Sequence, residues 1–385
     1  MQNTRRELLK GGLTLASLAA LGIPEWALPA LAQGETLVPF TDYPENFSAN
    51  PAPDRRVLDI RTIDGPITPA DKFFAIQHYG QPEVDAATYK LKVTGLVKSP
   101  LSLTVDELRK MGSQEITAGY ECSGNRRPVQ ALVSNGRWTG VPLKVVLDKA
   151  GLTPEAREIV FFGADHGEED VEFRTSTYKV DQQFGRSLQR DQAYGLDAMV
   201  VYALNGQPLT KHQGFPVRLL VPGWYGVANV KWLAQIHAQA DAYLGKFQAR
   251  WYRSLRGEMI DGEMKWVERP ISRMGFKSVV ARVTKMGADC KVSGFVLSDG
   301  SAVKSVEVKV DDGPWQAATL DPATKEKYSR KLYTNDWKGA TPGKHMIVSR
   351  VTGVDGRVQP TEQDLANKKT FLEDNSQHPR AVMIA

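Results

Sequence analysis

The chain has 385 residues, of which 42% are hydrophobic and 24% charged, as is usual for a globular protein. This length exceeds what one ordinary core accommodates, so we expect two or three domains. The net charge of +5 is a mild excess, and no run of Lys and Arg with interleaved aromatic residues occurs. The sequence therefore does not indicate a nucleic-acid-binding protein.

Residues 1–32 have the pattern of an export signal. Arg5 and Arg6 form a twin-arginine pair, and the apolar region Gly11 to Pro24 is too short to span a bilayer. Ala30-Leu31-Ala32 is a small-x-small cleavage site. We expect twin-arginine export of a folded protein to a bacterial periplasm, with no membrane span in the mature chain and a net charge of +4. The alternative is an N-terminal anchor.

The first half of the mature chain has mixed local patterns. Residues 33–70, rich in Pro, Asp and Asn, predict an extended arm. Alternating apolar residues in 89–93 predict a strand, and Thr104-Val-Asp-Glu107 is a capping box that predicts a short helix through Met111. A second helix is predicted between Pro142 and Gly151. Further predicted strands are Glu115–Tyr120, Ile159–Phe162, Met199–Leu204, Val217–Val221 and Val230–Ile236.

The pattern changes around residues 266–270. From Lys277 onward the sequence shows only short strands separated by turn signals, which is typical of an immunoglobulin-like β-sandwich. The predicted hairpin-type turns are Asp299-Gly300, Asp312-Gly313 and Asp355-Gly356. The predicted strands are Phe295–Leu297, Val306–Val310 and Met346–Val351.

The segment Glu121–Arg127 carries the strongest chemical signal. It places a thiol, an amide and two guanidinium groups within seven residues. A thiolate at Cys122 beside Arg126 and Arg127 would have a lowered pKa, which suits a metal ligand or a nucleophile. The alternative is a buried structural cysteine next to a solvated basic pair. The other cysteine, Cys290, lies far along the chain in a strand-like segment, so we expect no disulfide.

The run Tyr120-Glu-Cys-Ser-Gly-Asn-Arg-Arg127 resembles the molybdenum-binding loop of the sulfite oxidase family. The resemblance implies that the Cys122 sulfur binds molybdenum and that Arg127 faces an oxyanion substrate. It extends over residues 56–385 and implies an α+β protein. A mixed α/β molybdopterin-binding catalytic domain with its N-terminal arm, 33–265, would be followed by an immunoglobulin-like dimerisation domain, 266–385.

A second matching segment is Phe73-Phe74-Ala-Ile-Gln-His78. It resembles the family pattern Phe-Phe-x-Arg-Asn-His, which implies that Phe74 and His78 line the pterin and substrate pocket. Ile76 stands where many members have a sulfite-binding arginine, which puts the native substrate in doubt.

The remaining matches imply contacts with the cofactor or substrate. Trp138 resembles the pocket tryptophan, although alone it would read as a core aromatic residue. Tyr252 resembles the active-site tyrosine, and Arg380 lies where the family has another sulfite-binding arginine. The residues assigned to the cofactor by resemblance are Asp165, Gln213 (at a usual histidine position), Arg218, Asn229, Val230 and Lys231. Arg218 and Lys231 could donate to a pterin phosphate.

The resemblance implies oxidation of sulfite to sulfate at a molybdenum-molybdopterin centre in a homodimer. No Cys-x-x-Cys-His occurs and the six His residues are scattered, so we expect no haem and no zinc-type site in this chain. Electrons would then pass to a separate c-type cytochrome. Two alternatives remain. A sulfoxide reductase is favoured by Ile76 and opposed by Tyr252 and the sandwich. A catalytically inactive binding subunit is opposed by the intact Cys122 loop.

Overall fold

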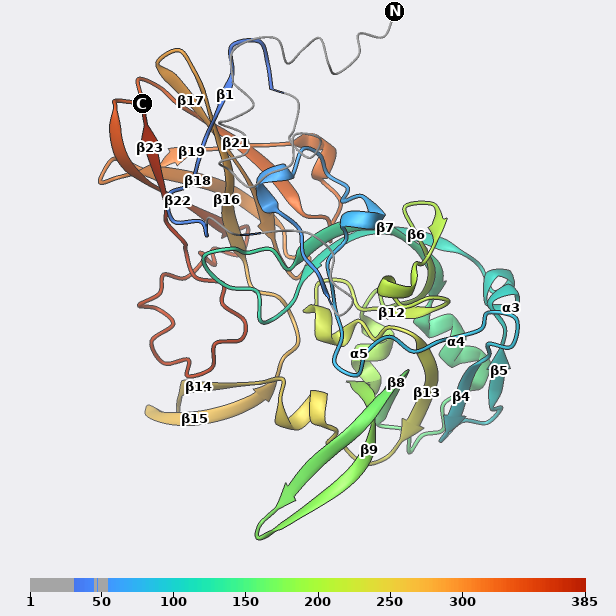
Figure 1. Cartoon of the computed structure of the whole chain (residues 1–385). Helices are drawn as coiled ribbons and strands as arrows, with labels where there is room; N and C mark the ends of the chain where they lie inside the picture. The colour runs from blue at the N-terminus through green and yellow to red at the C-terminus, as the bar shows by residue number, and fades with distance from the viewer. Residues whose placement is uncertain (1–30, 45–46, 48–54) are drawn as a thin grey trace, which may run out of the picture.

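The computed structural model describes residues 31–44, 47 and 55–385 (Figure 1). The predicted twin-arginine pair lies outside these residues. Two bodies follow one another along the chain, a mixed α/β domain and a β-sandwich, so the predicted α+β fold class is confirmed. Among the described residues, no helix has the length and apolar character needed to cross a membrane.

The first domain contains two five-stranded sheets. One has the order β11-β10-β7-β6 with β12 paired to β10, and the other has the order β5-β4-β13-β8-β9. Buried apolar residues from both sheets and the helices form its core. The strands are β4 (Leu91–Gly95), β5 (Leu101–Leu103), β6 (Gln114–Glu121), β7 (Val133–Pro142), β8 (Glu158–Phe173), β9 (Ser176–Gln189), β10 (Met199–Leu204), β11 (Gln207–Pro208), β12 (Arg218–Leu220) and β13 (Leu233–Gln239). The helices are α3 (Val105–Lys110), α4 (Leu143–Ala150) and α5 (Arg190–Gly195). Short turns are η2 (Ile60–Thr62), η3 (Ala70–Lys72), η4 (Lys211–Gln213), η5 (Gly226–Ala228) and the π-helical η6 (Lys246–Arg250), and β2 (Arg55–Arg56) pairs with β3 (Ala75–Ile76).

Both predicted helices are confirmed. At α3 the Thr104 hydroxyl accepts from the Glu107 N–H at 3.2 Å, and the Glu107 carboxylate accepts from the Thr104 N–H at 2.8 Å. This reciprocal pair satisfies two backbone donors that the helix leaves open. Helix α4 ends at Gly151, whose φ of 68° is the left-handed conformation that glycine adopts without strain.

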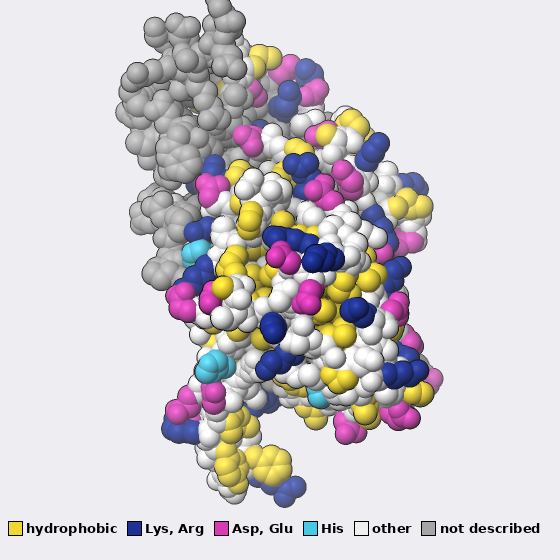
Figure 2. Space-filling view, turned by 90° about the vertical axis from the view of Figure 1, so that its right-hand side faces the viewer, with side chains coloured by type: hydrophobic (Ala, Val, Ile, Leu, Met, Phe, Trp, Pro, Cys, Tyr) yellow, Lys and Arg dark blue, Asp and Glu magenta, His cyan; other side chains and the backbone are white. Residues whose placement is uncertain are grey.

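Strands β8 and β9 extend far beyond the short strand predicted at 159–162. Their outer half projects from the domain as a hairpin at the bottom of Figure 1. Its end carries Phe173 and Tyr178, whose side chains are 67% and 57% exposed. Figure 2 shows hydrophobic side chains along the projection at the bottom of the molecule. The acidic run before Phe173 hid this strand, because it shows no apolar alternation. The inner half matters for function, since it carries Asp165 and Phe184.

The second body is a sandwich of two sheets. Their orders are β1-β16-β17-β21-β20 and β19-β18-β22-β23. A separate hairpin of β14 and β15 precedes it, and the predicted boundary at residue 266 falls within β15. The elements are β14 (Arg253–Ile260), β15 (Glu263–Pro270), β16 (Lys277–Met286), β17 (Asp289–Leu297), β18 (Val303–Val310), β19 (Gln316–Ala317), β20 (Thr319–Leu320), η7 (Pro322–Thr324), β21 (Lys331–Trp337), β22 (Gly343–Gly353) and β23 (Arg380–Ile384).

Two details of the sandwich differ from the prediction. Strand β1 (Thr36–Val38), which we placed with the first domain, pairs with β16 because Val38 and the following Phe40 bury their side chains in the sandwich core. The turn at Asp299-Gly300 joins β17 to β18, which belong to different sheets, so it is a crossover and not a hairpin. Asp312-Gly313 does join paired strands, β18 and β19.

Candidate active site

The loop that follows β6 meets the β3 segment, the inner part of β8–β9 and the β12–β13 connection at one pocket. The empty space at this pocket is about 620 Å³, including its opening to solvent. It brings together eight of the residues predicted from sequence, Phe74, His78, Cys122, Asp165, Arg218, Asn229, Lys231 and Tyr252, together with Ile76.

Cys122 lies in a tightly hydrogen-bonded turn. Its N–H donates to the Leu132 carbonyl at 3.0 Å, and its carbonyl accepts from the Asn125 N–H at 2.8 Å. The Asn125 side-chain oxygen accepts from the Leu132 N–H at 2.9 Å. These bonds fix the direction in which the thiol enters the pocket.

The prediction that the pKa of the Cys122 thiol is lowered was wrong for the protein without a bound metal. Burial raises the pKa of the thiol to about 11, and the neighbouring Glu121 carboxylate acts in the same direction. The expected lowering fails because Arg127 turns toward the sandwich domain. A bound metal cation would itself favour the thiolate.

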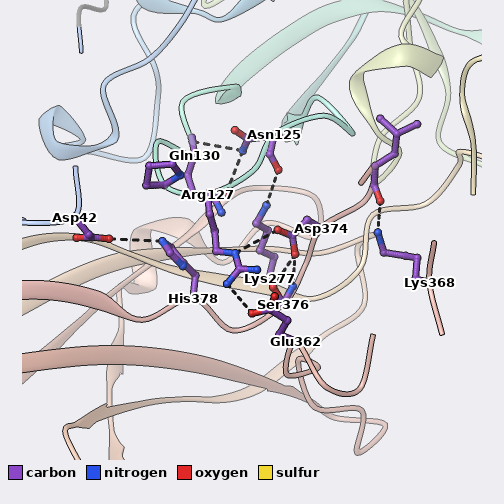
Figure 3. A network of polar contacts seen from close by, with 12 residues as sticks. Asp42, Asn125, Arg127, Gln130, Lys277, Glu362, Lys368, Asp374, Ser376 and His378 are labelled. Carbon is purple, nitrogen blue, oxygen red and sulfur yellow. Dashed lines mark hydrogen bonds and ion pairs between the residues drawn. The ribbon is translucent and has the colours of Figure 1, made fainter. Parts of the chain in front are cut away.

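A buried ion pair supports the turn from the sandwich domain. The Lys277 ammonium lies 2.9 Å from the Glu121 carboxylate, and the two side chains are 1% and 2% exposed. The same carboxylate accepts from the Asn125 amide at 2.8 Å. Figure 3 shows Lys277 reaching from the first residue of β16 toward Asn125. The residue before Cys122 is therefore held by the second body of the molecule.

Arg127 does not line the pocket. Its guanidinium lies 3.0 Å from Glu362 and 3.8 Å from Asp374, both in the long segment between β22 and β23 (Figure 3). Its side chain is 32% exposed. The predicted contact with an oxyanion is therefore absent from this conformation.

Arg380 lies outside the pocket as well, contrary to the prediction. It is fully buried, 3.4 Å from the Asp42 carboxylate, and its guanidinium lies over the rings of Phe40 and Tyr43. These partners come from the N-terminal arm, which packs against the sandwich. Arg380 thus holds the arm to β23.

His78 and Tyr252 form one wall of the pocket. The Tyr252 hydroxyl and His78 Nε2 are 2.9 Å apart, and the imidazole stacks on Phe247 at a centroid distance of 4.7 Å. Burial lowers the pKa of His78 to about 4, with Lys231 contributing, so the ring is neutral at pH 7. Burial also raises the pKa of Tyr252, so its hydroxyl keeps its proton.

The pocket also contains two buried cationic side chains and a buried carboxyl group. Arg218 is buried, and its guanidinium donates to the carbonyls of Gln213 and Asn229 at 3.0 and 2.8 Å. Burial lowers the pKa of Lys231 to about 7 and raises that of Asp165 to about 6. An anionic group bound here would favour the protonated, charged form of Lys231, which burial disfavours.

Three further predicted residues lie behind the wall and not on it. Trp138 is fully buried, donates to the Ala118 carbonyl at 3.1 Å and lies 5.1 Å beneath the Arg218 guanidinium. Gln213 and Val230 are also buried. Gln213 donates to the Ala70 carbonyl at 2.8 Å, so it shapes the pocket through the backbone.

Sequence reasoning missed several residues that line or support the pocket. Gln77, Tyr120 and Trp232 line it and stand inside or beside matched segments. Phe184 also lines it but belongs to β9, which was not predicted. Period-two alternation from Phe184 onward would have drawn attention to it and to Arg186.

The donor set of the pocket fits a molybdenum-pterin group. Within the described residues no cluster of three or more His, Cys, Asp or Glu side chains could by itself hold a metal, so Cys122 would be a single protein ligand. Asp165 has a buried side-chain oxygen without a hydrogen-bond partner, which suits a polar cofactor. Arg218 and Lys231 have the charge and position to hold a phosphate.

Comparison with known proteins gives a consistent result. Residues 78–247 match the family model described as an oxidoreductase molybdopterin binding domain. Mitochondrial sulfite oxidase of Macaca fascicularis is 31% identical over 300 residues, which cover 71% of this chain and 52% of that protein. Sulfite oxidase of Arabidopsis thaliana is 28% identical over 332 residues, 79% of this chain and 82% of that protein. The chain spans about half the length of the mammalian relatives that it matches.

A solved structure shares the whole fold. The sulfane dehydrogenase SoxCD from Paracoccus pantotrophus superimposes with a TM-score of 0.72 at 23% identity, covering 100% of this chain and 96% of that chain. Fold and site together define a molybdopterin-binding protein of the oxidoreductase class. Within that class, these matches support a member of the sulfite oxidase family.

Proposed function

We propose that this protein oxidises sulfite to sulfate in the bacterial periplasm. The observation that supports this most is that Cys122, Tyr252 and His78 line the same pocket as the cations Arg218 and Lys231. The molybdenum-pterin group, bound through Cys122, would supply oxygen-atom transfer and two-electron redox chemistry. The reaction balances as sulfite plus water giving sulfate, two protons and two electrons.

The roles of the chain's own residues follow from their environments. Arg218, Lys231 and Asn229 would hold the pterin and its phosphate, with Asp165 beside them. The protonated Tyr252 hydroxyl, oriented by His78, would donate to a substrate oxygen. Arg127 is retained in this proposal as an anion ligand, because an entering anion can displace Glu362 from its partly exposed side chain.

The electrons would leave one at a time to an external c-type cytochrome, since we expect no haem in this chain. We also propose twin-arginine export, which carries folded proteins, and homodimerisation through the sandwich. These points rest on sequence resemblance and on the charge and fold described above.

A second candidate is oxygen transfer to or from another sulfur compound, including sulfoxide reduction. One observation favours it: Ile76 lines the pocket where the family resemblance expects a cation. The loss of that cation would weaken an anion site.

A steady-state assay of the purified, molybdenum-loaded protein separates the two. Sulfite-dependent reduction of ferricyanide, an artificial one-electron acceptor, is expected. No rate with sulfite, combined with rapid oxidation of the reduced protein by methionine sulfoxide, would replace the first proposal by the second.

A further inference from the structure

Arg186 is a buried cation that no motif drew attention to. It is 1% exposed and follows the pocket residue Phe184 by two positions on β9, so the two side chains share a face of the strand. Its guanidinium donates to the Phe247 carbonyl at 2.5 Å and to the Ile271 carbonyl at 2.6 Å.

These two carbonyls belong to the segment that carries the pocket tyrosine. Phe247 stacks under His78, and the Ile271 N–H donates to the Tyr252 carbonyl at 2.8 Å. Arg186 therefore ties both sides of this segment to β9. It lies close enough to Tyr252 for the two groups to influence each other's pKa.

The charge of Arg186 has no counter-charge in the described part of the chain. Both hydrogen-bond partners are neutral carbonyls, Nε has no partner, and burial lowers the pKa of the guanidinium to about 10. An uncompensated buried charge is costly and persists where something else compensates it. Holding the two carbonyls in place requires only hydrogen-bond donors and would not require a charged side chain.

The position of the charge indicates what compensates it. Arg218 and Lys231 line the pocket, where we propose that they hold the cofactor. Arg186 instead binds the Phe247 and Ile271 carbonyls on either side of Tyr252, which lines the pocket together with Cys122. The wall at Ile76 is apolar. We propose that Arg186 determines specificity by placing positive charge beneath the reacting end of the pocket and thereby selecting anionic substrates, while it positions the Tyr252 segment.

The inference deepens the proposed function and rests on it for the identity of the anion. Its test uses sulfate as the probe and thermal stabilisation of the molybdenum-loaded protein as the readout, with sodium chloride at equal ionic strength as the reference. Arg186→Gln keeps amide donors for the carbonyls and removes the charge. Arg186→Lys keeps the charge with different geometry, and pH 6.5 favours its protonated form.

We expect Arg186→Gln to weaken sulfate binding about tenfold, or about 1.4 kcal/mol, and Arg186→Lys to stay within about threefold of the parent protein (about 0.7 kcal/mol). The sulfite KM should follow the same order, with a smaller change in kcat. Arg330→Gln is the matched control, because Arg330 is equally buried, contacts the Gly65 carbonyl and lies outside the pocket. It should lower stability and leave sulfate binding unchanged.

Sulfate binding that survives Arg186→Gln, equal losses in both Arg186 variants, or no sulfate binding by the parent protein would each overturn the inference. Failure of this inference can be distinguished from failure of the proposed function. Charge-dependent sulfate binding without sulfite turnover would remove the sulfite assignment and leave the anion-selecting role of Arg186 intact.

Discussion

Cys122 and Cys290 have contrasting surroundings. Cys122 lies at the pocket in a turn held by three hydrogen bonds, whereas Cys290 is 3% exposed in the sandwich core. Losing a group that only supports a metal ligand costs about 10- to 100-fold. We therefore expect Cys122→Ser to lose more than about 100-fold in turnover, with molybdenum content measured on the same sample. Cys290→Ser is the control and should keep its activity; comparable turnover in the two variants would contradict the ligand assignment.

Ile76 offers a gain-of-charge test at the pocket wall. Its side chain lines the pocket and its carbonyl accepts from the Lys231 ammonium at 3.0 Å. Ile76→Arg should lower the sulfite KM about tenfold, because one charge-assisted contact contributes roughly 1.5–3 kcal/mol. Ile76→Leu, which adds no charge, should leave the KM unchanged. Equal KM values in the two variants would show that this wall does not meet the anion.

The lowered pKa of Lys231 predicts how the stability of the protein without cofactor depends on pH. Its pKa falls from the usual 10.5 to about 7 in the folded state. Between these values the unfolded chain binds the extra proton, so this residue makes stability rise with pH, by at most about 1.4 kcal/mol per pH unit. Lys231→Met should remove that contribution. Urea unfolding at pH 7, 8 and 9 is the measurement, and parallel pH profiles for the two proteins would contradict the predicted pKa shift.

Sequence reasoning located residues that belong to short matched segments. Cys122, His78, Lys231 and Tyr252 were found this way and meet at one pocket. It misplaced Arg380, because a charged side chain is directed by its partners, and those of Arg380 are Asp42 on the N-terminal arm and the Pro128 carbonyl. The raised pKa of Cys122 was missed for the same reason, since burial comes from the tertiary structure.

Among the elements, local sequence signals predicted the helix boundaries correctly where a complete capping motif was present. The capping box before α3 and the Gly151 cap after α4 set those boundaries correctly. Strand β9 was missed because its outer half is exposed and carries only Tyr178 and Val180 as apolar residues, too short an alternation to indicate a 14-residue strand. The pairing of β1 with β16 was missed because only the sandwich core explains why the arm runs there.

The junction of β6 and β16 carries a stability prediction. Lys277→Met would leave Glu121 as an uncompensated buried charge, and breaking such a pair costs about 3–5 kcal/mol. Urea unfolding should show this loss, and Glu121→Gln combined with Lys277→Met should recover part of it. Lys338→Met is the matched control, since its pair with Asp289 is exposed and screened by solvent and therefore contributes little to stability. A loss at Lys277 no larger than that of the control would argue against a cross-domain role.

At the scale of the whole molecule, the sandwich contributes residues that support the active-site loop. It supplies Lys277 behind the Cys122 turn, and the segment between its last two strands supplies the partners of Arg127 (Figure 3). The active-site loop is thus assembled from both bodies. We expect the sandwich not to be removable without loss of the site.

We expect the mature protein to be a homodimer through the sandwich. Met346 and Met383 are 40% and 50% exposed and lie on one face of the sheet of β22 and β23, as a self-complementary apolar interface would require. Light scattering at micromolar concentration is the measurement. Met346→Lys combined with Met383→Lys should yield a monomer, and a monomeric parent protein would refute the expectation.

The central claim, sulfite oxidation with electrons passed singly to an external cytochrome, has one direct test. Molybdenum-loaded protein is mixed anaerobically with a limiting amount of sulfite and excess oxidised c-type cytochrome in a stopped-flow instrument. We expect two cytochromes to be reduced for each sulfite consumed, as the two-electron balance requires, at a rate that falls as ionic strength rises. Sulfite that remains unconsumed, or cytochrome that remains oxidised while the reduced protein reacts with a sulfoxide, would contradict the account.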